Sequence, residues 1–172
     1  MPSTGFREQF TAIEDAWTLA QGIVDTVREP VLVLDKELRV IAASRSFYSA
    51  FKVSPEDTQG RLLYALGDGQ WDIPKLRVLL EKILPEQGVM EGYEVEHEFP
   101  GVGHRTMCLN ARQVFYKGGT DRTILLGMED VTDRRVLERE KDELLQQKDV
   151  LLEEIQHRIA NSLQIIASII LL

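Results

Sequence analysis

Several residue types are scarce in this chain, and each scarcity excludes a class of protein. Cys108 is the only cysteine among 172 residues, so neither an intrachain disulfide nor a cysteine-based zinc site is available. A net charge of −8 leaves no basic surface of the kind that binds nucleic acid. No run of about 18 apolar residues occurs, and the N-terminus lacks the apolar centre of a secretory signal. We therefore expect a cytoplasmic protein with no membrane span and no nucleic-acid partner.

What the chain does contain divides into three regions. Apolar residues make up 44% of the sequence, which is typical of a folded protein. The length of 172 residues allows one ordinary domain plus an extension. We predict a flanking helix in residues 1–28, a globular domain in residues 29–132 and a long helix in residues 133–172. The first helix is predicted by apolar residues at spacings of three and four: Phe6, Phe10, Ile13, Trp17 and Ala20.

The first half of the globular region alternates short strands with helix signals. Residues 30–35 and 39–43 are β-rich runs separated by a polar turn, which predicts a hairpin. Ser44 is placed to cap a short helix that runs to Phe51. Ser54 and Pro55 predict the start of another helix. A clearer helix is expected at 73–84, where leucines and isoleucines share one face and Pro85 ends it.

Three longer strands are expected in the second half, at residues 93–99, 105–116 and 122–131. In the first, Tyr93, Val95, His97 and Phe99 alternate with glutamates, so they share one face. The whole order is two strands, short helices and three antiparallel strands. It predicts an α+β domain with a five-stranded antiparallel sheet.

This order of elements resembles the PAS domain, a sensory module of similar length. Residues 127–134 also resemble the Asp-x-Thr junction that ends many PAS domains in signalling proteins. The resemblance implies that Asp130 and Thr132 tie the last strand to the outgoing helix and relay the signal. Thr132 independently suits the N-cap of a helix that begins near Asp133.

The PAS resemblance also implies a cavity that holds haem, flavin or a small metabolite in some members. The candidates for lining such a cavity are Tyr64, Trp71, Met90, His97 and Met107, all of which are equally typical of an ordinary core. Cys108 is expected on a strand, where it does not fit the flavin-reactive helical cysteine of the photoactive members. No clustered ligands predict a metal site. The PAS ligand stays unknown at this stage.

Residues 133–172 have the repeat of a coiled coil. Leu137, Leu144 and Leu151 recur every seven residues, while Lys141 and Lys148 occupy the alternate core positions. After Leu151 the apolar stripe advances in steps of four, through Ile155, Ile159 and Leu163, which departs from the heptad phase. We expect a homodimer formed through this coiled coil and the N-terminal helix.

His157 lies on the polar side of this last helix. With about 100° per residue, the isoleucines and Leu163 of the stripe fall within roughly 80° of one another, and His157 lies about 160° from their centre. Glu153 and Asn161 share the side of His157. A helix of this kind can bury its stripe against a partner and still present the imidazole to a visiting protein.

This segment resembles the phosphoacceptor helix of sensor histidine kinases, specifically the HWE-type kinases and their relatives. It has their His-Arg pair, His157-Arg158, followed by Asn161 and a Leu-Gln step, while Gln156 and Ser162 depart from the commonest residues of the family. The resemblance implies that His157 takes a phosphoryl group from ATP with Mg²⁺ and passes it to an aspartate of a response regulator. Glu153, Arg158 and Asn161 would support the transfer.

The chain ends at Leu172 without a glycine-rich phosphate loop or an ATP-binding domain after His157. We therefore expect it to be the sensory and dimerisation part of a longer kinase, to hold no cofactor of its own and to be inactive alone. Two alternatives remain open. One is a PAS dimerisation module without catalysis, and the other is a haem- or flavin-based sensor.

Overall fold

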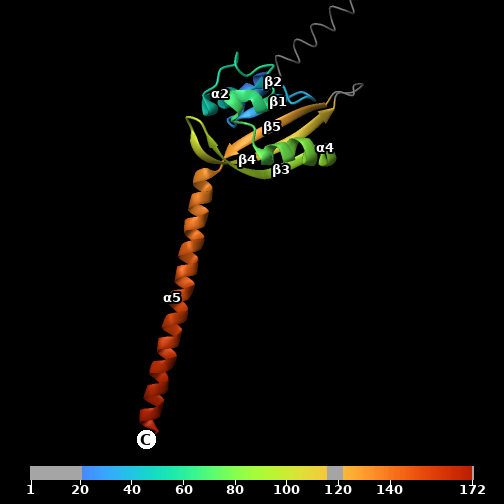
Figure 1. The fold of residues 1–172 in the computed structure, drawn as a ribbon. Helices are drawn as coiled ribbons and strands as arrows, with labels where there is room; N and C mark the ends of the chain where they lie inside the picture. The colour runs from blue at the N-terminus through green and yellow to red at the C-terminus, as the bar shows by residue number, and fades with distance from the viewer. Residues whose placement is uncertain (1–20, 116–121, 172) are drawn as a thin grey trace, which may run out of the picture. The chain divides into compact units, whose positions relative to one another are not determined.

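The computed structural model describes residues 21–115 and 122–171, which divide after Val131 into a compact unit and a helix (Figure 1). In the compact unit, the hairpin of β1 (Val31–Leu34) and β2 (Val40–Ala43) is followed by α2 (Arg45–Phe51) and the 3₁₀ segment η1 (Leu63–Gly69). Then come α3 (Pro74–Arg77), η2 (Val78–Ile83), α4 (Leu84–Gln87), and the strands β3 (Val89–Phe99), β4 (Gly103–Phe115) and β5 (Arg122–Asp130). The second unit is α5 (Thr132–Ile170).

The strands form one five-stranded sheet in the order β2-β1-β5-β4-β3, and every neighbouring pair is antiparallel. The predicted α+β class and the five antiparallel strands are confirmed. Placing β1 beside β5 brings the first hairpin against the last strand, with Leu32 opposite Leu126. The complete sheet therefore forms only when the first hairpin and the last strand of the domain are both in place.

One hydrophobic core joins the sheet to the short helices. The alternation predicted for β3 is present, because Val95 and Phe99 are buried while Glu96 and Glu98 are exposed. Leucines of the helical segments complete this core, among them Leu76, Leu79, Leu80 and Leu84. Burial of these side chains removes apolar surface from water at about 25 cal/mol per Å², the main force that holds the unit together.

The predicted cap of α2 is confirmed. The Ser44 hydroxyl accepts a hydrogen bond from the Phe47 N–H at 3.2 Å, which satisfies one of the free N–H groups of the first turn. Ser44 also accepts from the N–H of Val31 at 2.9 Å. The same hydroxyl thus fixes the start of α2 against the first strand.

The prediction that Pro85 ends the helix is wrong, because the helical path continues to Gln87. Proline lacks an N–H, and its ring collides with the carbonyl of the residue four positions earlier in a regular helix. Here the turns just before Pro85 widen into the π-helical η2, and Pro85 occupies the first turn of α4, where no N–H is needed. The helix ends instead at Gly88, which adopts φ 74° and donates its N–H to Leu84 O at 2.8 Å.

The helix predicted to begin at Ser54 and Pro55 is also wrong. The Ser54 hydroxyl does accept from the Asp57 N–H at 3.2 Å, but the following residues form turns. The reason is tertiary: Gly60 donates its N–H to Val40 O at 2.8 Å, and Val40 donates to Arg61 O at 2.9 Å. Pairing with β2 draws this backbone away from a helix. Of the predicted N-terminal helix, residues 21–26 are helical and residues 27 and 28 are not, while residues 1–20 lie outside the described part of the chain.

Candidate functional site

Helix α5 is a single uninterrupted helix of 39 residues, and none of them is buried. Its apolar side chains are therefore open to solvent: Leu144 is 65% exposed, Leu151 57% and Ile159 55%. Such a row of large apolar residues is unusual on the surface of a monomer and marks an interaction surface. The exposed residues include the heptad leucines and the four-step isoleucines of the predicted stripe.

His157 is exposed on the side of α5 away from this row. Glu153 lies one helical turn before it and Asn161 one turn after it, so the three side chains occupy one exposed face. Both nitrogens of an exposed imidazole are accessible to a second molecule. This face therefore places a nucleophile between a carboxylate and an amide.

Arg158 is not available to the histidine in this conformation. Its Nη2 atom pairs with Oε1 of Glu154 at 2.5 Å, one turn earlier in the helix. Arg158 is expected from the sequence to support the transfer, whereas its pairing with Glu154 is not anticipated there. The signal for this pair in the sequence is the spacing of four residues from Glu154 to Arg158, which favours ion pairs on a helix.

The predicted relay residues lie where the compact unit ends. Asp130 is the last residue of β5, and its carboxylate lies 3.1 Å from Nε of Arg105 on β4. Thr132 is the first residue of α5. Between them, the buried Val131 donates its N–H to Thr106 O at 2.9 Å. The end of β5 is thus anchored to β4 by an ion pair and a backbone bond, and Arg105 is an anchor that sequence reasoning did not identify.

Four of the five predicted cavity residues lie in or against the hydrophobic core: Tyr64, Trp71, Met90 and Met107. Tyr64, Trp71 and Met107 are buried in the core, whereas Met90 and His97 are only half-buried. The ring centroid of Trp71 lies 4.6 Å from that of Phe51, 5.7 Å from Phe47 and 5.2 Å from Phe99. The space around Trp71 is filled by the protein's own rings, packed at the separations usual for aromatic pairs.

Among the described residues, four buried side-chain polar atoms have no hydrogen-bond partner: the hydroxyls of Tyr48 and Tyr64, Nε1 of Trp71 and Nε2 of Gln113. Burial raises the pKa of Tyr64, since the phenolate would lose its hydration. The guanidinium carbon of Arg77 lies 4.0 Å from the centroid of the Tyr64 ring, a cation–π contact.

Arg77 is held in place by two carboxylates. Its Nε atom lies 2.5 Å from Asp72 and its Nη1 atom 3.2 Å from Glu81. The hydrogen bond from Arg77 lowers the pKa of Asp72. These exposed ion pairs position the cation over the Tyr64 ring, so this cluster has a structural role at the rim of the core.

The structure places His97 on β3 and both His104 and Cys108 on β4. No histidine occurs in the helical stretch from Pro74 to Gln87, and the ring of His97, on β3, stacks edge-on against Phe99 at 5.0 Å. Cys108 is buried on β4, where no helical cysteine site exists. In the described part of the chain, no three acidic, histidine or cysteine side chains gather as metal ligands.

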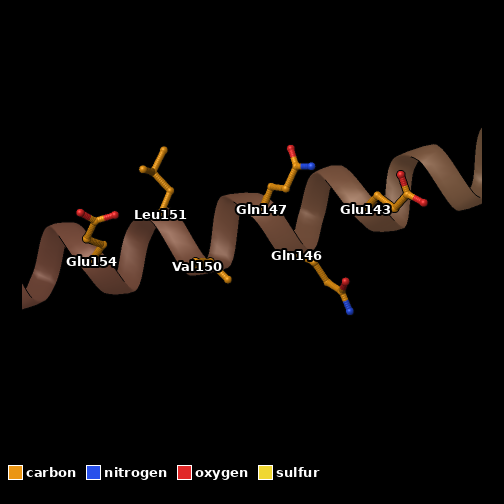
Figure 2. Close-up of a pocket in the computed structure, with 6 residues that line it drawn as sticks. All are labelled: Glu143, Gln146, Gln147, Val150, Leu151 and Glu154. Atoms are coloured by element: carbon orange, nitrogen blue, oxygen red, sulfur yellow. The ribbon is translucent and has the colours of Figure 1, made fainter.

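The surface of α5 carries a shallow depression between the side chains of Glu143, Gln146, Gln147, Val150, Leu151 and Glu154 (Figure 2). All six belong to one helix, so they cannot surround a small ligand as the walls of a cleft do. Over the described residues, no helix is apolar and long enough to cross a bilayer.

Comparison with known proteins agrees with this geometry. The fold is similar to the PAS domain of Bordetella pertussis BvgS, with a TM-score of 0.59 at 19% identity over 77% of this chain and 98% of that chain. It is also similar to a PAS domain from a two-component sensor histidine kinase (TM-score 0.53, 9% identity, 68% of this chain and 97% of that one).

An RNA-binding Light-Oxygen-Voltage receptor gives a TM-score of 0.60 at 13% identity, over 75% of this chain and 37% of that one. At these identities the likeness concerns the fold alone. No curated protein matches the chain by sequence. The family model of the PAS fold matches residues 24–136, more than half of the 172 residues, and the chain therefore belongs to the PAS fold family.

Proposed function

We propose that this chain is the sensory and dimerisation part of a cytoplasmic two-component sensor histidine kinase, with His157 as the phosphoacceptor. The observation that carries the proposal is the position of His157. It is exposed on α5, on the face opposite an exposed apolar row, in a helix that follows directly from the last strand of a PAS domain. The apolar row can pack against a partner helix while the side chain of His157 stays accessible to solvent.

The chemistry suits an exposed imidazole. A neutral ring nitrogen attacks the γ-phosphorus of ATP, the bond to the β,γ-bridging oxygen breaks, and ADP leaves as a P–N bond forms. The ring proton passes to a base, for which Glu153 lies one turn away. Such transfer depends mainly on positioning and charge stabilisation. The kinase's ATP-binding domain would hold ATP and Mg²⁺, and an aspartate of a response regulator would then accept the phosphoryl group.

The relay between sensor and histidine uses the end of β5. A change in the PAS domain that alters the Arg105–Asp130 pair alters the start of α5 at Thr132, because β5 and α5 are separated by one residue. Lys141 and Lys148 then weaken the first part of the coiled coil. The coiled coil then has two helix packings of similar energy. The signal shifts the balance between them and so changes how His157 is presented to the kinase domain or the regulator.

Phosphotransfer is the direct test. The full-length parent, or this chain together with a kinase-competent ATP-binding domain, is incubated with radiolabelled ATP and acid-labile, base-stable label is measured. We expect label on the wild type and none on His157→Ala. His104→Ala is the matched control, because His104 is also exposed but lies on β4. Undiminished label on His157→Ala would refute the proposal.

The same preparation separates the alternatives. A PAS module without catalysis would form dimers and take no label from any kinase domain. A haem- or flavin-based sensor would show a visible absorption band when purified. A labelled, colourless protein is the result that our proposal requires.

A further inference from the structure

Two serines at the start of α2 hold the residues that lead into the first strand. The Ser46 hydroxyl donates a hydrogen bond to Glu29 O at 2.7 Å, and Val27 O lies 3.3 Å from the same oxygen. The hydroxyl oxygens of Ser44 and Ser46 are 2.8 Å apart. Residues 27–30, which we call the entry segment, are therefore bonded to α2.

Counting protons gives the direction of these bonds. The Ser44 oxygen already accepts the N–H groups of Val31, at 2.9 Å, and of Phe47, at 3.2 Å. Each hydroxyl has one proton to donate, and the proton of Ser46 goes to Glu29 O. The proton of Ser44 goes to Ser46, because Glu29 O is farther from Ser44, at 3.4 Å. The two hydroxyls thus form a chain of hydrogen bonds that ends at Glu29 O, in which each bond polarises the next.

The other side of the entry segment is bonded to the last strand of the sheet. Met128 of β5 donates its N–H to Pro30 O at 2.9 Å. β5 ends two residues later at Asp130, where the ion pair with Arg105 holds it. The entry segment therefore connects α2 to the end of β5.

The opposite face of α2 packs into the aromatic core. Phe47 and Phe51 are buried on this helix, and their ring centroids lie 5.7 and 4.6 Å from that of Trp71. Helices transmit displacement as rigid elements. A shift of these rings therefore displaces Ser46, which lies on the same helix.

We propose that the hydroxyls of Ser44 and Ser46 couple the aromatic core to the end of β5 through the entry segment. A shift of α2 is passed to Glu29 O by the hydroxyl chain and to Met128 by the neighbouring carbonyl of Pro30. The same bonds act in reverse, so a displacement of the residues before the entry segment reaches α2.

This route is separate from the Arg105–Asp130 pair. Arg105 contacts β5 from β4, whereas the entry segment contacts it from the side of β1, its other neighbour in the sheet. The coupling itself is a property of the PAS domain. Only its effect on the phosphorylation of His157 rests on the proposed function.

Amide hydrogen exchange in the 172-residue chain, resolved by NMR, tests the coupling, because exchange reports local opening at each N–H. Ser46→Ala removes the bond to Glu29 O and leaves both N–H bonds to Ser44 in place. We expect the Met128 amide to exchange about fivefold faster, the change that loss of one hydrogen bond produces. The amide of Gln113 on β4, which donates to Gly88 O at 2.8 Å, should keep its rate.

Three variants serve as controls. Ser46→Thr keeps the hydroxyl and should keep the wild-type rate at Met128. Ser49→Ala changes an exposed serine of the same helix that lies outside the hydroxyl chain. Arg45→Gln breaks an exposed contact with Asp25 at 3.9 Å. Faster exchange at Met128 in any control, or an equal rise at Gln113 in Ser46→Ala, would mean general loosening and would refute the coupling.

A double-variant cycle tests whether the core is the origin of the movement. Phe51→Leu perturbs the packing against Trp71 and should speed exchange at Met128 relative to Gln113. Combined with Ser46→Ala it should add nothing further, because the route is already broken. The same additional rise in both backgrounds would show that the core reaches β5 without the serines, which contradicts the proposal.

The exchange measurements need no kinase domain, so they stand apart from the phosphotransfer test. Unchanged exchange in Ser46→Ala, with label that depends on His157, would overturn this inference and leave the proposed function. The expected exchange pattern, with label that persists in His157→Ala, would do the opposite. In the full-length parent that we propose, Ser46→Ala should reduce the difference in label with and without the signal, and Ser49→Ala should preserve it. An undiminished response in Ser46→Ala would exclude the entry segment from signalling.

Discussion

Arg158 and Glu154 form an ion pair one turn apart on α5, with 2.5 Å between Nη2 and Oε1. The pair lies beside His157, the histidine that we propose as phosphoacceptor. An exposed pair of this kind stabilises a helix by only about 0.3–0.5 kcal/mol. A phosphoryl group on His157 carries more charge than a carboxylate and competes for the same guanidinium. If His157 is phosphorylated, we therefore expect Glu154 to limit how often Arg158 reaches the phosphoryl group.

Glu154→Gln should release Arg158 and lengthen the lifetime of the phosphohistidine by roughly two- to threefold, the effect of an ion pair of this strength. The chain can be phosphorylated chemically with phosphoramidate, so no kinase domain is needed, and ³¹P NMR follows the decay. Glu143→Gln removes a carboxylate elsewhere on α5 and is the control. A lifetime equal to that of the wild type would show that Arg158 does not contact the phosphoryl group.

Phe99 and Phe115 give a matched test of the aromatic core. Phe99 is 1% exposed and packs against Trp71, while Phe115 is 64% exposed at the end of β4. Phe99→Ala should destabilise the domain by about 3–5 kcal/mol, since it leaves a cavity among packed rings. Phe115→Ala should cost less than about 1 kcal/mol. Urea denaturation followed by tryptophan fluorescence measures both.

A similar loss for the two variants would contradict the packing around Trp71. It would mean that the rings separate readily, as they would around a binding cavity.

Asp130→Asn tests the relay. The carboxylate lies 3.1 Å from Nε of Arg105, and both side chains are more than a third exposed. The substitution should cost less than about 1 kcal/mol of stability. In the full-length kinase that we propose, it should nevertheless change the ratio of signal-on to signal-off phosphorylation, because the pair holds the end of β5.

Arg105→Gln breaks the same pair from β4 and should reproduce this effect, whereas Arg61→Gln, which breaks an exposed pair with Asp57, should not. The measurement is label on His157 with and without the signal. Unchanged signalling in both Asp130→Asn and Arg105→Gln would exclude the pair from the relay.

The sequence predicted those parts of the fold that depend on local pattern. The alternation in β3, the cap at Ser44 and the unbroken helix after Asp133 all follow from residues close in sequence. The end of the helix at Pro85 was mispredicted because a wider helical turn before the proline removes the clash between its ring and the preceding backbone. No residue type in the sequence predicts that wider turn. The turn after Ser54 was mispredicted because pairing with β2 outweighs a good cap.

In the candidate site, too, the features that depend on nearby residues were predictable and those that depend on tertiary contacts were not. The position of His157 relative to the apolar row follows from helical periodicity alone. The Arg105–Asp130 contact does not, because it depends on the register of β4 against β5, in which Asp130 lies opposite Met107, two residues from Arg105. The filled space around Trp71 depends on rings from α2 and β3 that only the folded chain brings together.

Replacing Lys141 and Lys148 with leucine tests whether a weak seam is needed for signalling. Both substitutions complete the apolar row and remove two cations from a closing interface, so the dimer should tighten by well over tenfold. If signalling requires two packings of similar energy, the stronger seam should hold one of them, and the full-length kinase should lose its response to the signal while keeping label on His157. Arg139→Leu adds the same kind of side chain outside the seam and should keep the response. A double-leucine kinase that still switches would show that the signal reaches His157 without a change in this part of the coiled coil.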